Sequence, residues 1–472
     1  MVFSSISFIF LFLPFFLFLD RVVKGSLRNF LLIAASLLFY IWGEGYGVVL
    51  LVVLSIINLG FGKLLTIYEH SKAKVDVRKF VLFVGVSVNL GILLYYKYLF
   101  WIVSELSSII PYMQNIHVKE HALPLGISFF TFHAISYLVD IYKGIVKTHS
   151  SEDFLTYFFM FPHLVAGPIV RFEGVRENLQ ARKEEGSCID KTLFSYGVFR
   201  FVLGVNKKVL IANSVAPLAD LAFYSWNPSL GAIDAWIGAL AYTVQIYFDF
   251  SGYSDMAIGL AAMMGVRFDE NFRAPYKSDS IKEFWRRWHI SLSSWLRDYL
   301  YFPLGGSRCS KICTYRNLLT VFILCGLWHG AQFTFLAWGL FHGGLLILER
   351  TKFGALLSSW PSCARRCYCM LMVVIGWVLF RAENLSQAIA YIGCMFDLTN
   401  LTTTFATAGW INLSALVIGL ITAVTTKEYF TYQKENARHY PIWLFVANLM
   451  LFFVSIAVLY TSNRNPFIYF NF

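Results

Sequence analysis

Charged side chains are scarce in this chain of 472 residues. They make up 14% of the sequence, whereas 57% of the residues are hydrophobic and 18% are aromatic. A soluble domain carries roughly 25% charged residues, and a disordered chain carries more charge and fewer apolar residues. A surface with so little charge must face lipid over much of its area. The composition therefore excludes a disordered chain and argues against an ordinary soluble enzyme.

The motifs of common soluble active sites are also absent. The sequence has neither GxxxxGK[ST] nor GxGxxG after a strand, so it offers no cradle for nucleotide phosphates. It has no GxSxG, so a serine-hydrolase elbow is not supported. The triplet Cys363, Cys367 and Cys369 matches no standard zinc knuckle. We expect neither a metal site nor a bound cofactor, and we interpret these cysteines as free thiols on a cytoplasmic loop.

The charge that is present is unbalanced, with a net value of +11. In a soluble chain this excess would suggest nucleic acid, but in a membrane protein it is expected from basic cytoplasmic loops. Lys and Arg residues follow the apolar runs 6–19 and 48–62. The positive-inside rule places both loops in the cytoplasm and the N-terminus in the periplasm. We therefore expect the lipid bilayer, and no nucleic acid, as a partner.

The apolar runs predict one all-helical domain over residues 1–472, with about ten to thirteen spans. Three runs are irregular. Residues 154–170 contain Pro162, Gly167 and Pro168, which predicts a broken or re-entrant segment. Residues 233–264 form a long run with polar residues in its middle. Residues 317–348 would span about 48 Å as one helix, against a hydrocarbon core of about 30 Å, so we expect a division near Gly326 and Gly330.

Polar residues inside apolar runs are costly and therefore informative. Asp249 and Asp255 lie about 600° apart at 100° per residue of a helix, so they project to different sides. This disfavours a pair of carboxylates that act together as acid and base. A buried hydrogen-bond network between helices is the more common role of such residues.

Apolar residues recur at spacings of three and four over residues 281–300. The pattern predicts one amphipathic helix, with its tryptophans on the apolar side and Arg286 and Arg287 on the polar side. His289 falls at the edge of the apolar stripe, where a packed, hydrogen-bonded histidine is more common than a catalyst. Ordinary contact with lipid phosphates would also explain why Arg286 and Arg287 lie on the polar side.

His329 lies inside an apolar run between two glycines. An ionisable residue there suggests a functional site, and the ordinary pKa of histidine near 6.5 suits a general base. A structural histidine bonded to a carbonyl at the kink is an equal alternative, and His342 has the same surroundings in sequence. Asn271 could donate a hydrogen bond to a substrate carbonyl, although a turn or cap role is more common.

Several stretches together resemble the membrane-bound O-acyltransferase superfamily, and its bacterial alginate O-acetyltransferase branch in particular. The matching stretches are Met-Val-Phe-Ser at the start, Pro124-Leu-Gly-Ile-Ser-Phe, Phe161-Pro-His-Leu-Val-Ala-Gly-Pro168, Tyr247-Phe-Asp-Phe-Ser-Gly-Tyr-Ser-Asp-Met-Ala-Ile-Gly259, Glu283-Phe-Trp-Arg-Arg-Trp-His-Ile-Ser-Leu292, Gly326-Leu-Trp-His-Gly330 and Asn465-Pro-Phe-Ile-Tyr-Phe. The likeness covers nearly the whole chain, with a catalytic core of about residues 120–350.

The resemblance implies a ring of tilted and re-entrant helices around a thinned centre with a tunnel. It implies transfer of an acyl group to a hydroxyl, with His329 as the catalytic histidine and His289 as a second histidine on the donor side. Asn271, Trp328, Arg286, Arg287, Asp249 and Tyr253 are the candidate substrate-binding residues. The implied donor is cytoplasmic acetyl-CoA. The implied partners are a periplasmic acetyltransferase of the SGNH type and a polysaccharide, and the implied location is the bacterial inner membrane.

Residues 267–316 carry ten basic and five acidic side chains, a net charge of +5. This block suits an anionic donor such as coenzyme A, whose phosphates need a basic cytoplasmic face. Two other functions stay open. One is a non-catalytic channel or scaffold for a periplasmic enzyme, and the other is D-alanyl transfer to teichoic acid, as in a sibling branch. A transporter would predict inverted repeats, which the sequence does not show.

Overall fold

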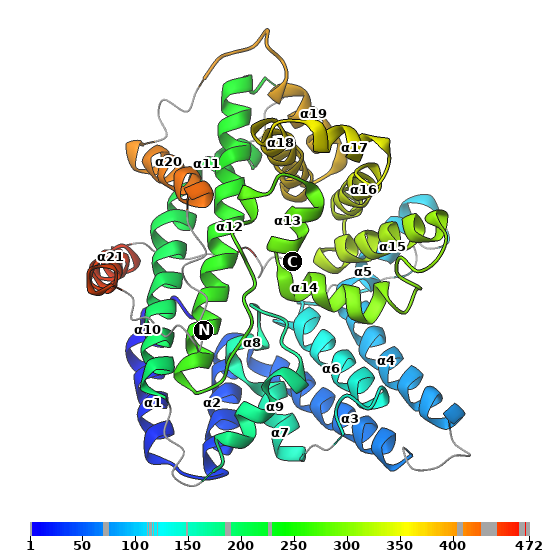
Figure 1. The fold of residues 1–472 in the computed structure, drawn as a ribbon, viewed down its shortest axis with the longest axis vertical. Helices are drawn as coiled ribbons and strands as arrows, with labels where there is room; N and C mark the ends of the chain where they lie inside the picture. Colours follow the sequence, from blue (N-terminus) through cyan, green and yellow to red (C-terminus); the bar gives the residue numbers. More distant parts are fainter. Residues whose placement is uncertain are drawn as a thin grey trace. The chain divides into compact units, whose positions relative to one another are not determined.

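The computed structural model describes residues 2–68, 75–110, 112, 116, 118–119, 121–147, 150–184, 190–224, 229–403, 409–425, 441–461 and 468. Over these residues the chain is helical, without a strand (Figure 1). It divides into two compact units, one of residues 1–201 and 256–269 and the other of residues 202–255 and 270–472. The prediction of a single domain stays a prediction.

The first unit contains α1 to α9. These are α1 (Leu13–Val22), α2 (Leu27–Glu44), α3 (Val48–Ile67), α4 (Val75–Lys97), α5 (Leu99–Ile109), α6 (Ile127–Tyr142), α7 (Ser151–Phe159), α8 (Phe161–Leu164) and α9 (Phe172–Ala181). Beyond α8, residues 165–171 are not helical, which confirms the predicted break in the run 154–170. Phenylalanine rings in edge-on and tilted contact, those of Phe8, Phe39 and Phe161, pack α8 against the helices at the N-terminus.

Buried polar groups join the helices of the first unit. The Asp20 carboxylate accepts from Arg28 at 2.9 Å and from Arg182 at 2.6 Å, so one carboxylate connects α1, α2 and the end of α9. Asn58 of α3 and Asn89 of α4 exchange side-chain hydrogen bonds of 2.8 and 3.0 Å. Paired amides of this kind satisfy polar groups that lipid cannot hydrate.

Two long helices contribute to both units: α10 (Lys191–Asn206) and α12 (Ala232–Met263). The second unit also contains α11 (Asn213–Phe223), α13 (Ile281–Arg287), α14 (Ile290–Leu296), α15 (Lys311–His329), α16 (Phe333–Leu348), α17 (Lys352–Ser359), α18 (Ser362–Arg381), α19 (Leu385–Met395), α20 (Trp410–Thr425) and α21 (Ile442–Thr461). The run 233–264, which the sequence analysis counts among the irregular ones, forms one helix. Cys363, Cys367 and Cys369 lie on α18, so the prediction that they occupy a loop is wrong.

Among the described helices, four segments are long and apolar enough to cross a membrane: Leu27–Ile67, Val77–Lys97, Ser362–Arg381 and Ile442–Thr461. The first comprises α2 and α3 with a short turn between them. Shorter apolar helices include α6, α16 and α20. The helices at the two ends of the chain carry many exposed aliphatic and aromatic side chains, which is the surface that lipid requires.

Candidate active site

The helices α15 and α16 form an antiparallel hairpin in the second unit (Figure 1). Glycines lie where the two helices touch. A Cβ atom on Gly326 would clash with the backbone carbonyl of Phe335, and one on Gly339 would clash with the carbonyl of Phe322. Small residues permit such close approach of two helices. The expected division of the run 317–348 is confirmed, and it falls directly after His329.

His329 is the last residue of α15 and is 5% exposed. Aromatic rings surround its imidazole, with ring-centre distances of 4.9 Å to Trp328, 5.0 Å to Phe380 and 5.3 Å to Trp338. The side chain thus lies in a packed aromatic shell at the turn of the hairpin. Such a setting fixes the orientation of the ring and limits access of water.

His289 interrupts the amphipathic segment. Its backbone has φ 42° and ψ 56°, in the left-handed region, and it separates α13 from α14. The expectation of one helix over residues 281–300 is therefore wrong. Residues 271–273 form hydrogen bonds with backbone groups that would pair within a continuous helix. The Arg273 N–H donates to the Arg287 carbonyl, and the Ile290 N–H donates to the Asn271 carbonyl, both at 2.9 Å. Non-glycine residues in this conformation are strained and are frequent at functional sites.

Asn271 organises the polar side of this break. Its Oδ1 accepts from the Ser291 hydroxyl at 2.8 Å and from the Ser291 N–H at 3.2 Å, and it lies 3.2 Å from His289 Nδ1. Its Nδ2 donates to the Ser254 hydroxyl at 3.1 Å. Because Oδ1 can only accept, the contact with His289 requires the proton on Nδ1 and leaves the lone pair on Nε2. Asn271 therefore selects one tautomer of His289.

Trp328 connects the two histidines. Its ring lies 6.3 Å from that of His289 and 4.9 Å from that of His329, measured between centres. The Phe250 ring of α12 contacts His289 edge-on at 4.7 Å. The structure thus brings together three residues that the sequence analysis singled out (His289, Trp328 and His329), with Asn271 behind the first of them. All are buried.

The N-terminus of α13 is capped by Glu349, which lies far away in the sequence, and by Ser280, which directly precedes the helix. The Glu349 carboxylate accepts from the Ile281 N–H at 2.7 Å and from the Lys282 N–H at 3.0 Å. The Ser280 hydroxyl caps the Glu283 N–H in addition. Burial raises the pKa of Glu349, against the effect of these two backbone hydrogen bonds, which lower it. The helix that precedes His289 is therefore fixed to the end of α16.

Arg286 and Arg287 lie at the end of α13, directly before the break. Arg286 is exposed, whereas Arg287 pairs with Glu283 at 2.8 Å and donates to the Arg273 carbonyl. Nearby, Arg365 of α18 pairs with Asp279 at 2.6 Å. Partial burial acts to raise the pKa of Asp279, but the hydrogen bonds with Arg365 and Glu283 and the charge of Arg365 together hold it below its usual range. Arg286 is thus the more available of the two predicted donor-binding arginines.

Asp249 and Asp255 point to different lysines, as their helical spacing predicts. Asp249 pairs with Lys208 and Asp255 with Lys207, each at 2.6 Å. Asp249 also accepts from the Ile468 N–H at 2.8 Å, so both of its oxygens are engaged. Tyr253 is 1% exposed on the same helix. These contacts match the predicted buried network, and a role of Asp249 and Tyr253 in substrate binding stays a prediction.

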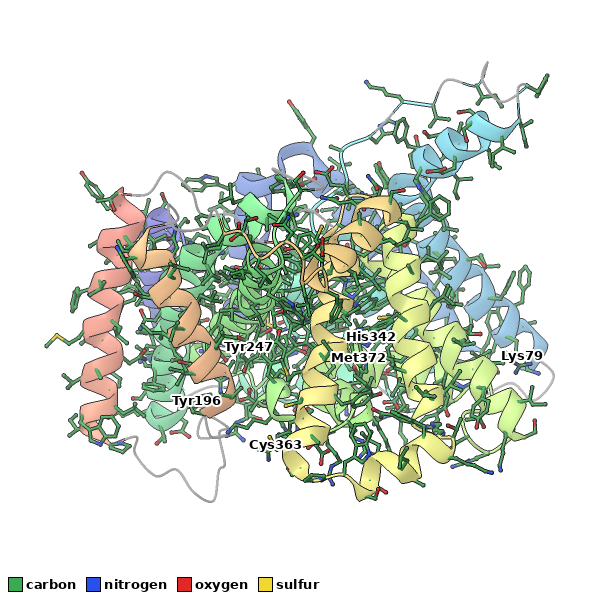
Figure 2. The ribbon with its side chains drawn as sticks, turned by 90° about the horizontal axis from the view of Figure 1, so that it is seen from above. Lys79, Tyr196, Tyr247, His342, Cys363 and Met372 are labelled. Atoms are coloured by element: carbon green, nitrogen blue, oxygen red, sulfur yellow. The ribbon has the colours of Figure 1, made fainter. Side chains whose placement is uncertain are left out.

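His342 has surroundings different from those of His329. Its ring lies 5.2 Å from Trp285 and 5.1 Å from Trp338, and a Cβ on Gly376 would come 2.6 Å from its Nε2. In Figure 2 the residue lies near Met372 of α18, where α16 and α18 pack together. His342 thus fills the space that Gly376 leaves open.

Sequence reasoning missed Ser254, Ser291 and Glu349. Ser254 stands in the polar stretch of α12 and Ser291 two residues after His289, so both were visible as neighbours of motifs. Glu349 ends a long apolar run, and nothing in the sequence connects it to α13. In the described part of the chain, no group of three or more His, Cys, Asp or Glu side chains could hold a metal ion.

The arrangement suits acyl transfer to a hydroxyl. A neutral imidazole can take the proton from an attacking hydroxyl group. An N–H donor next to the reacting carbonyl can stabilise the oxyanion that develops. The cluster of His289, Trp328 and His329 offers imidazole nitrogens and an indole N–H in a site from which bulk water is largely excluded.

Comparison with known proteins agrees with this chemistry. Residues 111–389 match the family described as MBOAT, membrane-bound O-acyltransferase family. This match covers α6 to α18, including both histidines of the cluster.

Individual relatives cover most of the chain. It is 41% identical to the probable alginate O-acetylase AlgI of Pseudomonas putida over the full length of both proteins. It is 46% identical to the protein of that name from Pseudomonas aeruginosa, over 84% of this chain and 75% of the other. A peptidoglycan O-acetyltransferase of Helicobacter pylori is 33% identical over 84% of this chain and 80% of the relative. The chain belongs to the membrane-bound O-acyltransferase family and is a multi-pass membrane O-acyltransferase.

Proposed function

We propose that the protein moves acetyl groups from cytoplasmic acetyl-CoA across the inner membrane for the O-acetylation of an extracytoplasmic polysaccharide. The names of the relatives support acetyl as the acyl group and alginate or peptidoglycan as the type of acceptor. A periplasmic acetyltransferase of the SGNH type would take the acetyl group onward. The basic loops favour the orientation with the N-terminus in the periplasm.

The observation that carries the proposal is the contact of His289 and His329 with one tryptophan. In this mechanism His329 takes the proton of the acceptor hydroxyl while the hydroxyl oxygen attacks the thioester carbonyl, or it carries the acetyl group transiently. The carbon–sulfur bond then breaks, and the proton reaches the departing thiolate. Trp328 Nε1 and His289 are the candidates for stabilising the oxyanion.

Asn271 acts on the reaction through His289. Its amide group is engaged with Ser254 and Ser291, and its side chain is fully buried, so it serves as a positioning residue rather than a donor to substrate. It holds His289 in the left-handed conformation with the lone pair on Nε2. Arg286, exposed at the end of α13, is placed to contact the phosphates of coenzyme A.

Transfer from radiolabelled acetyl-CoA to a polysaccharide acceptor, with the periplasmic partner present, tests this function. We expect His329→Ala to abolish transfer, because no other group of the cluster has the same position. His342→Ala is the matched control, since this histidine is also buried but lies against Gly376. It should keep activity provided that the variant folds, which size-exclusion chromatography checks.

Three results would contradict the proposal. Full transfer by a folded His329→Ala variant would show that His329 is not the catalytic base. Absence of acetyl transfer by the intact protein, with the partner present, would favour the channel or scaffold. Transfer of D-alanine from a loaded carrier protein, without use of acetyl-CoA, would place the chain with the teichoic acid D-alanyltransferases, one of which, from Bacillus subtilis, is 30% identical over 51% of this chain.

A further inference from the structure

The chain contains two Cys-x-x-x-Cys pairs with different local structure. Cys309 and Cys313 lie on either side of the start of α15, which begins at Lys311. Cys363 and Cys367 both lie within α18. All four are free thiols, and the first pair is half-buried whereas the second is exposed. The same spacing thus occurs once at a helix start and once inside a helix.

The first pair is held together by Asn317. Its Nδ2 donates to the carbonyls of Leu304 and Gly306 at 3.0 and 3.1 Å, and it lies 3.8 Å from both Cys309 Sγ and Cys313 Sγ. The two sulfur atoms therefore contact the same amide nitrogen. The buried amide of Asn317 therefore contacts both the turn before α15 and the two sulfur atoms.

Further polar groups surround these sulfurs. Cys309 Sγ lies 3.6 Å from the Gly306 carbonyl and 3.8 Å from the Thr314 hydroxyl. Arg316 Nη2 donates to Cys313 Sγ at 3.4 Å. Donors and a positive charge next to sulfur favour the thiolate, which is the reactive form. The interaction with Cys313 lowers the pKa of Cys309 and raises the pKa of Cys313, so Cys309 ionises more readily than Cys313.

Disulfide geometry separates the two pairs. A disulfide needs Cβ atoms about 3.5–4.5 Å apart. Residues four apart on a regular helix have Cβ atoms about 5–6 Å apart, which is too far without distortion. Cys363 and Cys367 have this helical separation. Cys309 precedes its helix, so the regular helical spacing does not fix its distance from Cys313. Both sulfur atoms lie 3.8 Å from Asn317 Nδ2.

We propose that Cys309 and Cys313 are a dithiol site that peroxides oxidise to a reversible disulfide. The Cys309 thiolate attacks a peroxide oxygen, the O–O bond breaks, and a sulfenic acid forms with release of hydroxide. The Cys313 sulfur then attacks the sulfenic sulfur, the S–S bond forms, and the S–O bond breaks. The Cys313 proton leaves in the water that is released. Two thiols are oxidised, and one hydrogen peroxide is reduced to two water molecules.

The sequence makes this disulfide easy to detect, because trypsin cleaves after Lys311, between the two cysteines. The full-length protein in detergent is treated with hydrogen peroxide, alkylated, digested and examined by mass spectrometry. We expect residues 309–311 and 312–316 as one linked species, which dithiothreitol separates. Trypsin also cleaves after Arg365 and Arg366, so a disulfide between Cys363 and Cys367 would likewise link two peptides. We expect no such linkage and expect both thiols to be alkylated.

Cys309→Ser tests the order of events. This variant should lose the linked species, and its Cys313 should stay open to alkylation at peroxide concentrations that oxidise the wild type. Alkylation of both thiols in the oxidised wild type would overturn the proposal. Equal formation of a disulfide between Cys363 and Cys367 would also overturn it, because the spacing in sequence alone would then explain disulfide formation. The wild-type measurement does not depend on the folding of any variant.

Discussion

The ion pair of Lys208 and Asp249 yields a sharp prediction about stability. Its nitrogen and oxygen lie 2.6 Å apart, and the side chains are 0% and 3% exposed. Lys208→Met keeps the length and most of the volume of the side chain but removes the charge. The Asp249 carboxylate then keeps the Ile468 N–H as the one donor that the described residues show.

Removing one partner of a buried pair costs about 3–5 kcal/mol, because a desolvated charge is left behind. The ratio of folded to unfolded protein should fall by roughly two to four orders of magnitude, since about 1.4 kcal/mol is a factor of ten. Unfolding by heat and by denaturant in detergent micelles measures this loss. The double variant Lys208→Met with Asp249→Leu should recover most of it, because an apolar pair needs no compensation.

Lys207 offers a matched control on the neighbouring position. It pairs with Asp255 at the same distance, but its side chain is 20% exposed. Lys207→Met should therefore cost less than Lys208→Met. A Lys208→Met protein as stable as the wild type would refute the reasoning. An Asp249→Asn protein with unchanged stability and lost acetyl transfer would instead support the role of Asp249 in substrate binding.

Three further predictions concern the candidate site. Gly326→Ala should destabilise the hairpin by about 1–3 kcal/mol in thermal unfolding, because its Cβ clashes with backbone, whereas Gly344→Ala, with nothing within 4 Å, should stay near wild type. Asn271→Ala should lower kcat more than it raises KM and should shift the pH profile, because His289 loses its fixed tautomer; an unchanged profile would refute this. Glu349→Gln should cost about 0.5–2 kcal/mol of stability, as lost helix caps do, and equal melting temperatures would contradict it.

Much of the architecture could be predicted from periodicity and composition. The long helix over residues 232–263, the broken segment near Pro162 and the division after His329 all follow from local patterns of apolar residues, glycine and proline. The helix over residues 281–300 could not be predicted correctly. Its interruption at His289 depends on a hydrogen bond that the Asn271 carbonyl accepts and one that the Arg273 N–H donates. No local pattern in residues 281–300 encodes a partner from another segment.

The candidate site could likewise be predicted only in part from the sequence. Sequence motifs single out His289, His329 and Asn271, because polar groups in apolar runs are costly and therefore conspicuous. Local context does not separate His329 from His342, since both lie between glycines in apolar helices, and only the family resemblance favours His329. Packing separates them: His329 shares Trp328 with His289, whereas His342 fills the space beside Gly376.

The sequence by itself determined that the chain is a basic, helical membrane protein with an acyl-transfer motif set, because hydrophobicity, charge bias and local spacing are properties of neighbouring residues. Only the tertiary structure decided the tautomer of His289, the lysine partners of Asp249 and Asp255, and the capping of α13 by Glu349. Each of these depends on groups from separate segments that meet only after the helices have packed, and short-range interactions fix them at that point.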